Sequence, residues 1–153
     1  MAMVPFFSRF RELAIRETRY ATVRGDPVLP DGDYGFIELY CDDPRCDCRR
    51  VVVNVFSAAA PTKVLATINY GWEDITFYEE WLGDKELAQD AVGAALDPLN
   101  PQTTYAPALL ELFRYIVEDE AYVERLRRHY AMFKAALREP RRRMRGKKRR
   151  PRR

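Results

Sequence analysis

The order of two hydrophobic patterns constrains the fold of this chain most strongly. Three runs rich in β-branched and aromatic residues come first: Tyr34–Tyr40 (YGFIELY), Arg50–Ser57 (RVVVNVFS) and Val64–Tyr70 (VLATINY). Turn-forming residues separate these runs, which predicts three antiparallel strands. After Gly71 the pattern changes to helical periods. Strands followed by helices favour an α+β fold over a doubly wound sheet.

Helices are expected on both sides of these strands. Residues 6–19 have an approximately helical rhythm, whereas the following GDPVLPDGDYG has the composition of an irregular loop. The later helical segments are ITFYEEWL, KELAQDAVGAAL, ALLELFRYIVED and a last helix from about Tyr122 to Leu137. Pro98 and Pro101 are expected to end the second of these. We therefore predict an α+β fold with a small antiparallel sheet of about three strands followed by several helices.

Charge divides the chain into two parts. Residues 138–153 contain eleven of the 26 basic residues and one of the 23 acidic residues, so this segment carries +10 and residues 1–137 carry −7. A chain of 153 residues suits one domain. The basic segment has too few hydrophobic residues to fold by itself. We expect a single α+β domain over residues 1–137 and a disordered Arg/Lys-rich tail over residues 138–153.

Hydrophobicity and cysteine content indicate the cellular setting. No stretch approaches the roughly 18 apolar residues of a membrane helix, and Pro5, Ser8, Arg9 and Arg11 interrupt the N-terminal segment. Three cysteines cannot all pair within one chain. A bridge between Cys46 and Cys48 would close a strained ring. We therefore expect a cytoplasmic protein that makes no membrane contact and keeps its cysteines reduced.

The three cysteines form the strongest candidate site. They follow the pattern Cys41-x₄-Cys46-x-Cys48 between the first two predicted strands. Three soft ligands this close together are typical of zinc, which takes about four such ligands when it is structural. Asp42, Asp43 and Asp47 lie among them. Because imidazole with thiolates is a common zinc set, the preferred fourth ligand is His129, the one histidine of the chain.

The surroundings of His129 indicate the direction of its side chain. Tyr122, Leu126, Met132 and Phe133 share a helical stripe with it, so the imidazole is expected to face the core. We predict one Cys₃His zinc ion that joins the hairpin to the last helix. The alternative is a hydrogen-bonded core histidine, which is the more common role of a lone histidine on an apolar face.

Two other uses of the cysteines compete with zinc binding. A catalytic cysteine would take His129 as its base and an aspartate as orienting group, but no glycine-rich elbow or Cys-x₅-Arg loop is present. A redox sensor is a stronger alternative. Arg45, Arg49 and Arg50 would lower the thiol pKa, and the nearby aspartates would oppose them.

The runs FIELYCDDPRCDCRRVVVNV and ATINYGWE, the DPLNP turn and the RLRRHYAMFK helix resemble a family of small uncharacterised bacterial proteins. Some members are described as carrying a metal-binding motif similar to that at the C-terminus of the secretion ATPase, in which C-x-C precedes a Cys-Cys or Cys-His pair. Cys46 and Cys48 match its first half. The resemblance implies a metal and a bacterial cytoplasmic setting, and it implies no activity.

The aromatic residues and the tail bear on nucleic-acid binding. Tyr70, Trp72, Phe77, Tyr78 and Trp81 have acidic neighbours, which favours core packing over base stacking for most of them. The tail offers a sequence-independent contact to phosphates. Its candidate residues are Arg141, Arg142, Arg143, Arg145, Lys147, Lys148, Arg149, Arg150, Arg152 and Arg153. The alternative is a solvated tail that lies over its own acidic domain.

These observations lead to one preferred function and one alternative. The preferred function is a non-enzymatic, zinc-stabilised interaction module whose tail contacts RNA or DNA and whose body binds a protein partner. The alternative is a thiol-based redox sensor or cysteine-dependent enzyme that uses Cys41, Cys46 and Cys48.

Overall fold

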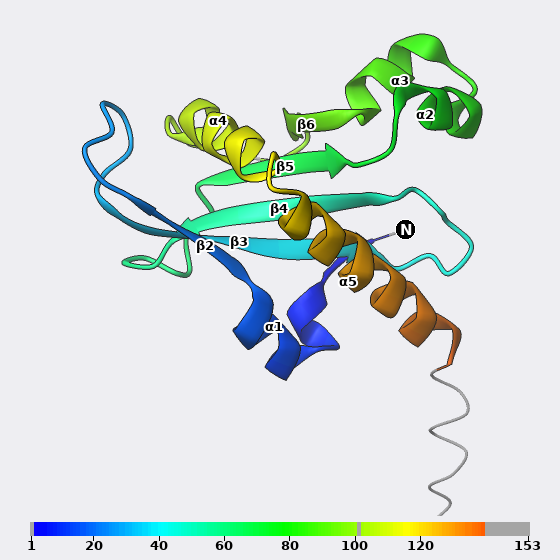
Figure 1. Cartoon of the computed structure of the whole chain (residues 1–153), viewed down its shortest axis with the longest axis horizontal. Helices are drawn as coiled ribbons and strands as arrows, with labels where there is room; N and C mark the ends of the chain where they lie inside the picture. Colours follow the sequence, from blue (N-terminus) through cyan, green and yellow to red (C-terminus); the bar gives the residue numbers. More distant parts are fainter. Residues whose placement is uncertain (1, 101, 140–153) are drawn as a thin grey trace, which may run out of the picture.

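A six-stranded antiparallel sheet forms the centre of the computed structural model, which describes residues 2–100 and 102–139 (Figure 1). The strands are β1 (Met3–Pro5), β2 (Arg19–Val23), β3 (Gly32–Cys41), β4 (Arg50–Ser57), β5 (Ala66–Gly71) and β6 (Gly93–Leu96). The helices are the 3₁₀ turn η1 (Phe6–Ser8), α1 (Arg11–Glu17), α2 (Ile75–Leu82), α3 (Lys85–Ala91), α4 (Ala106–Ile116) and α5 (Glu120–Arg138). The α+β class is therefore as predicted.

The sheet is built around β3. The strand order is β1-β3-β4-β5-β6, and β2 also pairs with β3. Along one edge of β3, β2 pairs with Gly32–Phe36 and β1 pairs with Leu39–Cys41. The opposite edge pairs with β4. Both edges of β3 are paired as far as Leu39, and β1 alone continues the pairing to Cys41, where the candidate site begins.

The predicted sheet of about three strands is wrong, because the described residues contain six. The three expected strands are β3, β4 and β5. The strands that were missed are short, and in β1 and β6 tertiary pairing matters more than local propensity. The segment KELAQDAVGAAL was expected to be one helix, but α3 ends at Ala91 and Gly93, with a φ of 71°, begins β6. Similarly, the predicted helix over residues 6–19 divides into η1, α1 and the start of β2.

One face of the sheet carries the hydrophobic core. Side chains alternate along each strand, so Val51, Val53 and Val55 point to the same face and are fully buried. Helices α4 and α5 lie across this face (Figure 1). The Phe113 ring of α4 contacts Phe36 and Tyr70 from two different strands. The core therefore lies between the sheet and these two helices.

Helix α5 connects this core to the candidate site. Asp119 caps its N-terminus by accepting a hydrogen bond from the backbone N–H of Ala121. Its buried stripe includes Tyr122, Leu126 and Phe133, as the sequence predicts. Near its C-terminal end, the Nζ of Lys134 donates to the backbone oxygen of Asp43, 2.8 Å away, in the β3–β4 loop. The last helix and the cysteine loop are thus in direct contact.

The structure bears on the membrane prediction, but it does not describe the basic tail residues. Within residues 2–100 and 102–139, no helix is long and apolar enough to cross a membrane. The basic residues from Arg141 onward, which are the candidates for nucleic-acid contact, lie outside the described part of the chain. Helix α5 ends at Arg138, one residue beyond the predicted end of the folded domain.

Candidate metal centre

The structure brings the three cysteines together. Cys41 is the last residue of β3, and Cys46 and Cys48 lie in the loop that leads to β4. Their sulfur atoms all lie within 4.8 Å of one another. A tetrahedral ion with metal–sulfur bonds of about 2.3 Å needs sulfur atoms about 3.8 Å apart, so a small contraction would suffice. The cluster can therefore hold a metal ion through three thiolates, as the sequence predicts.

Backbone hydrogen bonds of Asp43 shape the loop around the thiols. Its backbone N–H donates to the Cys41 sulfur at 3.4 Å, and its carbonyl accepts from the Cys46 N–H at 3.2 Å. Its carboxylate accepts from the Arg45 N–H at 2.9 Å. The local turn thus folds Cys46 back toward Cys41 without any cross-link.

The residue after Cys48 anchors the other end of the loop. Arg49 adopts a φ of 48°, a conformation that is uncommon for a residue other than glycine. Its backbone N–H donates to the Tyr130 hydroxyl of α5 at 3.2 Å, and its carbonyl accepts from the Tyr78 hydroxyl of α2 at 2.8 Å. Its guanidinium lies 4.3 Å from the centre of the Phe77 ring. Two helices therefore fix the position of the cysteine loop.

Of the five aromatic residues expected to pack mainly in the core, Tyr70 and Tyr78 are buried, Trp72 and Phe77 are partly buried and Trp81 is exposed. The hydroxyl of Tyr78 has a further role, because it contacts the Arg49 carbonyl next to Cys48. The prediction of core packing for most of these rings is thus confirmed.

A buried positive charge lies beside the ligand loop. Lys134 is only 6% exposed, and its Nζ shares the Asp43 carbonyl with the N–H of Cys46. Three thiolates with one divalent ion carry a net charge of about −1. Because a buried charge is costly without an opposite charge nearby, Lys134 suits the anionic complex that such an ion would form.

The protonation of Cys46 would depend on a bound cation. Burial, together with the neighbouring Cys48 and Cys41, raises the pKa of Cys46 to about 12, because all three disfavour the charged thiolate. Without a metal, this thiol is therefore protonated at neutral pH. A bound cation stabilises the thiolate and reverses this preference. The raised pKa also disfavours a reactive Cys46 nucleophile, since the thiolate is the reactive form.

The structure does not bring His129, the predicted fourth ligand, to the cysteines. The imidazole is fully buried, as expected, but its Nδ1 lies 2.7 Å from Oε1 of Glu38 and its Nε2 lies 3.1 Å from Oε1 of Glu17. The ring also stacks on Phe6, with 4.2 Å between the ring centres. Both ring nitrogens are thus already paired with carboxylates, which is the hydrogen-bonded alternative that the sequence left open.

Glu38 belongs to this second cluster and was missed at the sequence level. It is 4% exposed, and its Oε1 also accepts a hydrogen bond from the Tyr40 hydroxyl. The strand pattern contained a signal, because Phe36, Glu38 and Tyr40 alternate onto the same buried face. A carboxylate at such a position needs a buried partner.

Glu17 completes the cluster from α1. Arg128 donates two hydrogen bonds to its carboxylate, at 2.8 and 2.7 Å. The hydrogen bond from Arg128, together with His129, lowers the pKa of Glu17 to about 2. Glu17, Glu38 and His129 therefore join α1, β3 and α5 into one hydrogen-bonded unit, which we call the histidine cluster.

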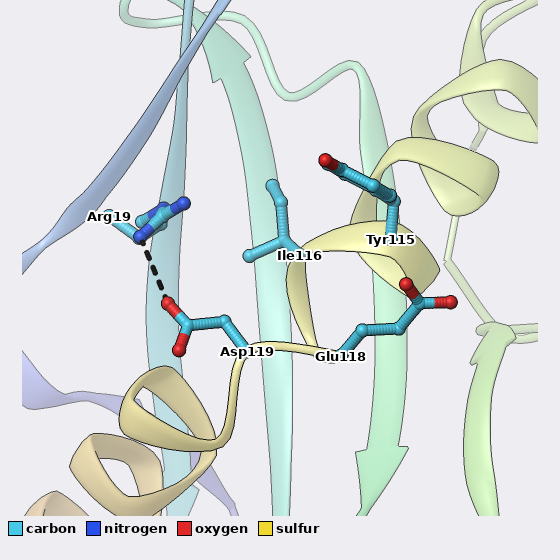
Figure 2. A pocket seen from close by; sticks show the side chains of 5 residues that line it. All are labelled: Arg19, Tyr115, Ile116, Glu118 and Asp119. Carbon is cyan, nitrogen blue, oxygen red and sulfur yellow. Dashed lines mark ion pairs between the residues drawn. The ribbon is translucent and has the colours of Figure 1, made fainter.

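A separate hollow of about 380 Å³ lies near the turn between α4 and α5 (Figure 2). It is lined by Arg19, Tyr115, Ile116, Glu118 and Asp119. Figure 2 shows Arg19 facing Asp119, and 3.9 Å separates their charged atoms. No cysteine or histidine lines the hollow, so it is not part of the candidate metal centre.

Comparison with protein-family models, curated proteins and solved structures finds no match to this chain. The resemblance to a bacterial family with a cysteine motif therefore stays a prediction.

Proposed function

We propose that the protein binds one zinc ion through Cys41, Cys46 and Cys48 and that this ion stabilises an interaction module. The observation that carries the proposal is the convergence of three thiols within 4.8 Å of one another. Thiolates favour soft and borderline ions, and zinc is the common structural ion of such sets. A reducing cytoplasmic setting would keep the thiols available.

A structural role for zinc is supported by the contacts of the loop. The loop already contacts α5 through Tyr130 and Lys134 and α2 through Tyr78. An ion that joins the end of β3 to the start of β4 would stiffen the loop that these helices contact. We propose that the zinc-bound loop provides a protein-binding surface, and that the protein is not an enzyme.

The tail would supply a second contact. The chain continues from α5 into the ten Lys and Arg residues between Arg141 and Arg153. Each phosphate that such residues neutralise releases counterions, so RNA or DNA binding should weaken steeply with salt. A cluster of cationic side chains carries little sequence preference.

A thiol-based redox sensor is the alternative function. Cys46 is only partly buried, whereas Cys41 and Cys48 are buried. An alkylating reagent applied to the native protein distinguishes the two functions. Zinc-bound thiolates are expected to resist alkylation until a chelator is added. Rapid alkylation without chelator would favour the sensor.

Metal analysis of Cys46→Ser tests the zinc proposal. Wild type should contain one zinc ion per chain, and Cys46→Ser should lose most of it because one of three ligands is removed. Arg45→Ala is the matched control, since Arg45 is exposed in the same loop and should leave the zinc content unchanged. Wild-type protein that purifies without any metal and cannot be loaded would contradict the proposal.

Removal of residues 140–153 tests the tail. RNA and DNA binding should fall by at least tenfold at low salt, and the salt dependence should flatten. A variant with glutamine at the ten basic tail positions keeps the chain length and should behave like the truncation. Unchanged binding in both variants would remove the role of the tail.

A further inference from the structure

We infer that the fourth coordination position of the ion is filled from outside the chain, by the thiolate of a small thiol that replaces a water molecule. This inference rests on the proposed zinc binding, and it assigns a ligand class to the same site. It departs from the closed Cys₃His site that the sequence predicts.

The amino-acid composition restricts where a fourth protein ligand could come from. The chain has three cysteines and one histidine. Residues 1, 101 and 140–153 contain no cysteine, histidine, aspartate or glutamate. The usual nitrogen, sulfur and carboxylate ligands of zinc are therefore all within the described part of the chain.

Each described side chain with suitable chemistry near the loop has other partners. His129 pairs with Glu38 and Glu17. The carboxylate of Asp42 accepts from the Ala2 N–H at 2.8 Å, and that of Asp43 accepts from the Arg45 N–H at 2.9 Å.

Asp47, the third aspartate of the loop, is also engaged. Its carboxylate accepts hydrogen bonds from the Arg49 guanidinium and from the Tyr130 hydroxyl, the latter at 3.1 Å. Within residues 2–100 and 102–139, the cysteines form the one His/Cys/Asp/Glu group placed to hold an ion.

Exposure and charge indicate what can fill the remaining position. Cys41 and Cys48 are 1% and 6% exposed, whereas Cys46 is partly exposed, so a ligand can approach on the side of Cys46. Water would occupy an open zinc position in the absence of a better ligand. A thiolate is a softer ligand than water and matches the other three. The buried ammonium of Lys134 beside the loop offsets the negative charge that a fourth thiolate adds.

The exchange is a simple ligand substitution. The incoming thiol loses its proton to solvent, its sulfur forms a bond to zinc, and the bound water leaves. No atom changes oxidation state. The affinity for the thiol should therefore rise with pH until the thiol is fully ionised, because the thiolate is the binding form.

Cobalt(II) substitution of the full-length protein tests the inference. Cobalt in a thiolate site absorbs visible light, and its bands change when the fourth ligand changes. The protein is kept reduced with a phosphine, loaded with cobalt and titrated with glutathione. We expect the bands to shift in a saturable manner at one glutathione per ion. Unchanged bands at saturating glutathione would show a closed site, and removal of the ion by glutathione would equally overturn the inference.

Variants of the engaged residues provide the controls. Asp42→Asn, Asp47→Asn and His129→Gln should leave the cobalt spectrum before thiol addition unchanged. A changed spectrum in any one of these variants would identify a fourth protein ligand and overturn the inference. If His129→Gln does not fold, the other two variants still test the aspartates. A wild-type protein that binds neither cobalt nor zinc would instead overturn the proposed function, which separates the two failures.

Discussion

The cysteine loop and the histidine cluster differ in how completely their polar groups are paired. Helix α5 contributes adjacent residues to both, with His129 in the cluster and Tyr130 against the loop. In the cluster, both imidazole nitrogens and both carboxylates have protein partners. In the loop, three thiols lie together, and the pKa of Cys46 is raised by its burial and by the two neighbouring thiols. The polar groups of the histidine cluster are satisfied within the protein, whereas the three thiols are placed so that they could hold a metal ion.

Glu38→Ala should have the largest effect and should act on stability alone. It removes the buried hydrogen-bond partner of both His129 and Tyr40, and each buried polar group left without a partner costs about 1–3 kcal/mol. Urea unfolding measures this loss, and the fraction that stays folded should keep its full zinc content. The control is Glu124→Ala, at an exposed position of α5, the helix that carries His129. Loss of zinc from folded Glu38→Ala would mean that the two regions are not separate.

Metal removal should have the next largest effect, and it acts through the cysteine loop. Zinc present at a hundredfold excess over its dissociation constant stabilises the folded state by about 2.7 kcal/mol. A chelator should remove this stabilisation from wild type and lower its melting temperature. Cys46→Ser should respond little. An equal response of both proteins to chelator would contradict a structural role for the ion.

Lys134→Met should weaken zinc binding by about tenfold, because it removes the buried positive charge beside an anionic site. Competition with a chromogenic chelator measures the affinity. Lys85→Met is the matched control, since Lys85 is exposed on α3. Equal zinc affinity in the two variants would remove the proposed role of Lys134.

Acid should lower the free energy of unfolding through the histidine cluster, and this effect should be the smallest of those predicted here. Because the pKa of Glu17 falls from 4.5 to about 2 on folding, its contribution is present above pH 4.5 and is lost as the pH falls toward 2. The expected loss is about 1 kcal/mol, since Arg128 is half-exposed and solvent screens the pair. The free energy of unfolding, measured with urea between pH 5 and 2.5, should change less steeply with pH in Glu17→Gln than in wild type. Identical slopes would contradict this assignment.

The sequence predicts the cysteine loop, but of the histidine cluster it predicts only the inward direction of His129. The cysteine loop could be predicted because its ligands are close in the chain and two strongly patterned strands flank it. The inward direction of His129 also followed from the stripe on α5. The partners of His129 could not be predicted in this way. Glu17 and Glu38 are 112 and 91 positions away, and they meet the imidazole only through the packing of α1 and β3.

The missed strands have a similar cause. β1 contains three residues and ends in Pro5, and β6 is built from glycine, alanine and leucine. Neither segment has strong strand propensity, and each becomes a strand by pairing with β3 or β5. Local pattern predicts the long central strands, while the edges of the sheet depend on the tertiary fold.

X-ray absorption at the zinc edge of the purified full-length protein tests the central claim most directly. We expect three sulfur neighbours at about 2.3 Å and one lighter neighbour, which a fourth sulfur replaces when a small thiol is added. The absence of zinc, fewer than three sulfur neighbours, or the multiple-scattering pattern of an imidazole ring from His129 would contradict it.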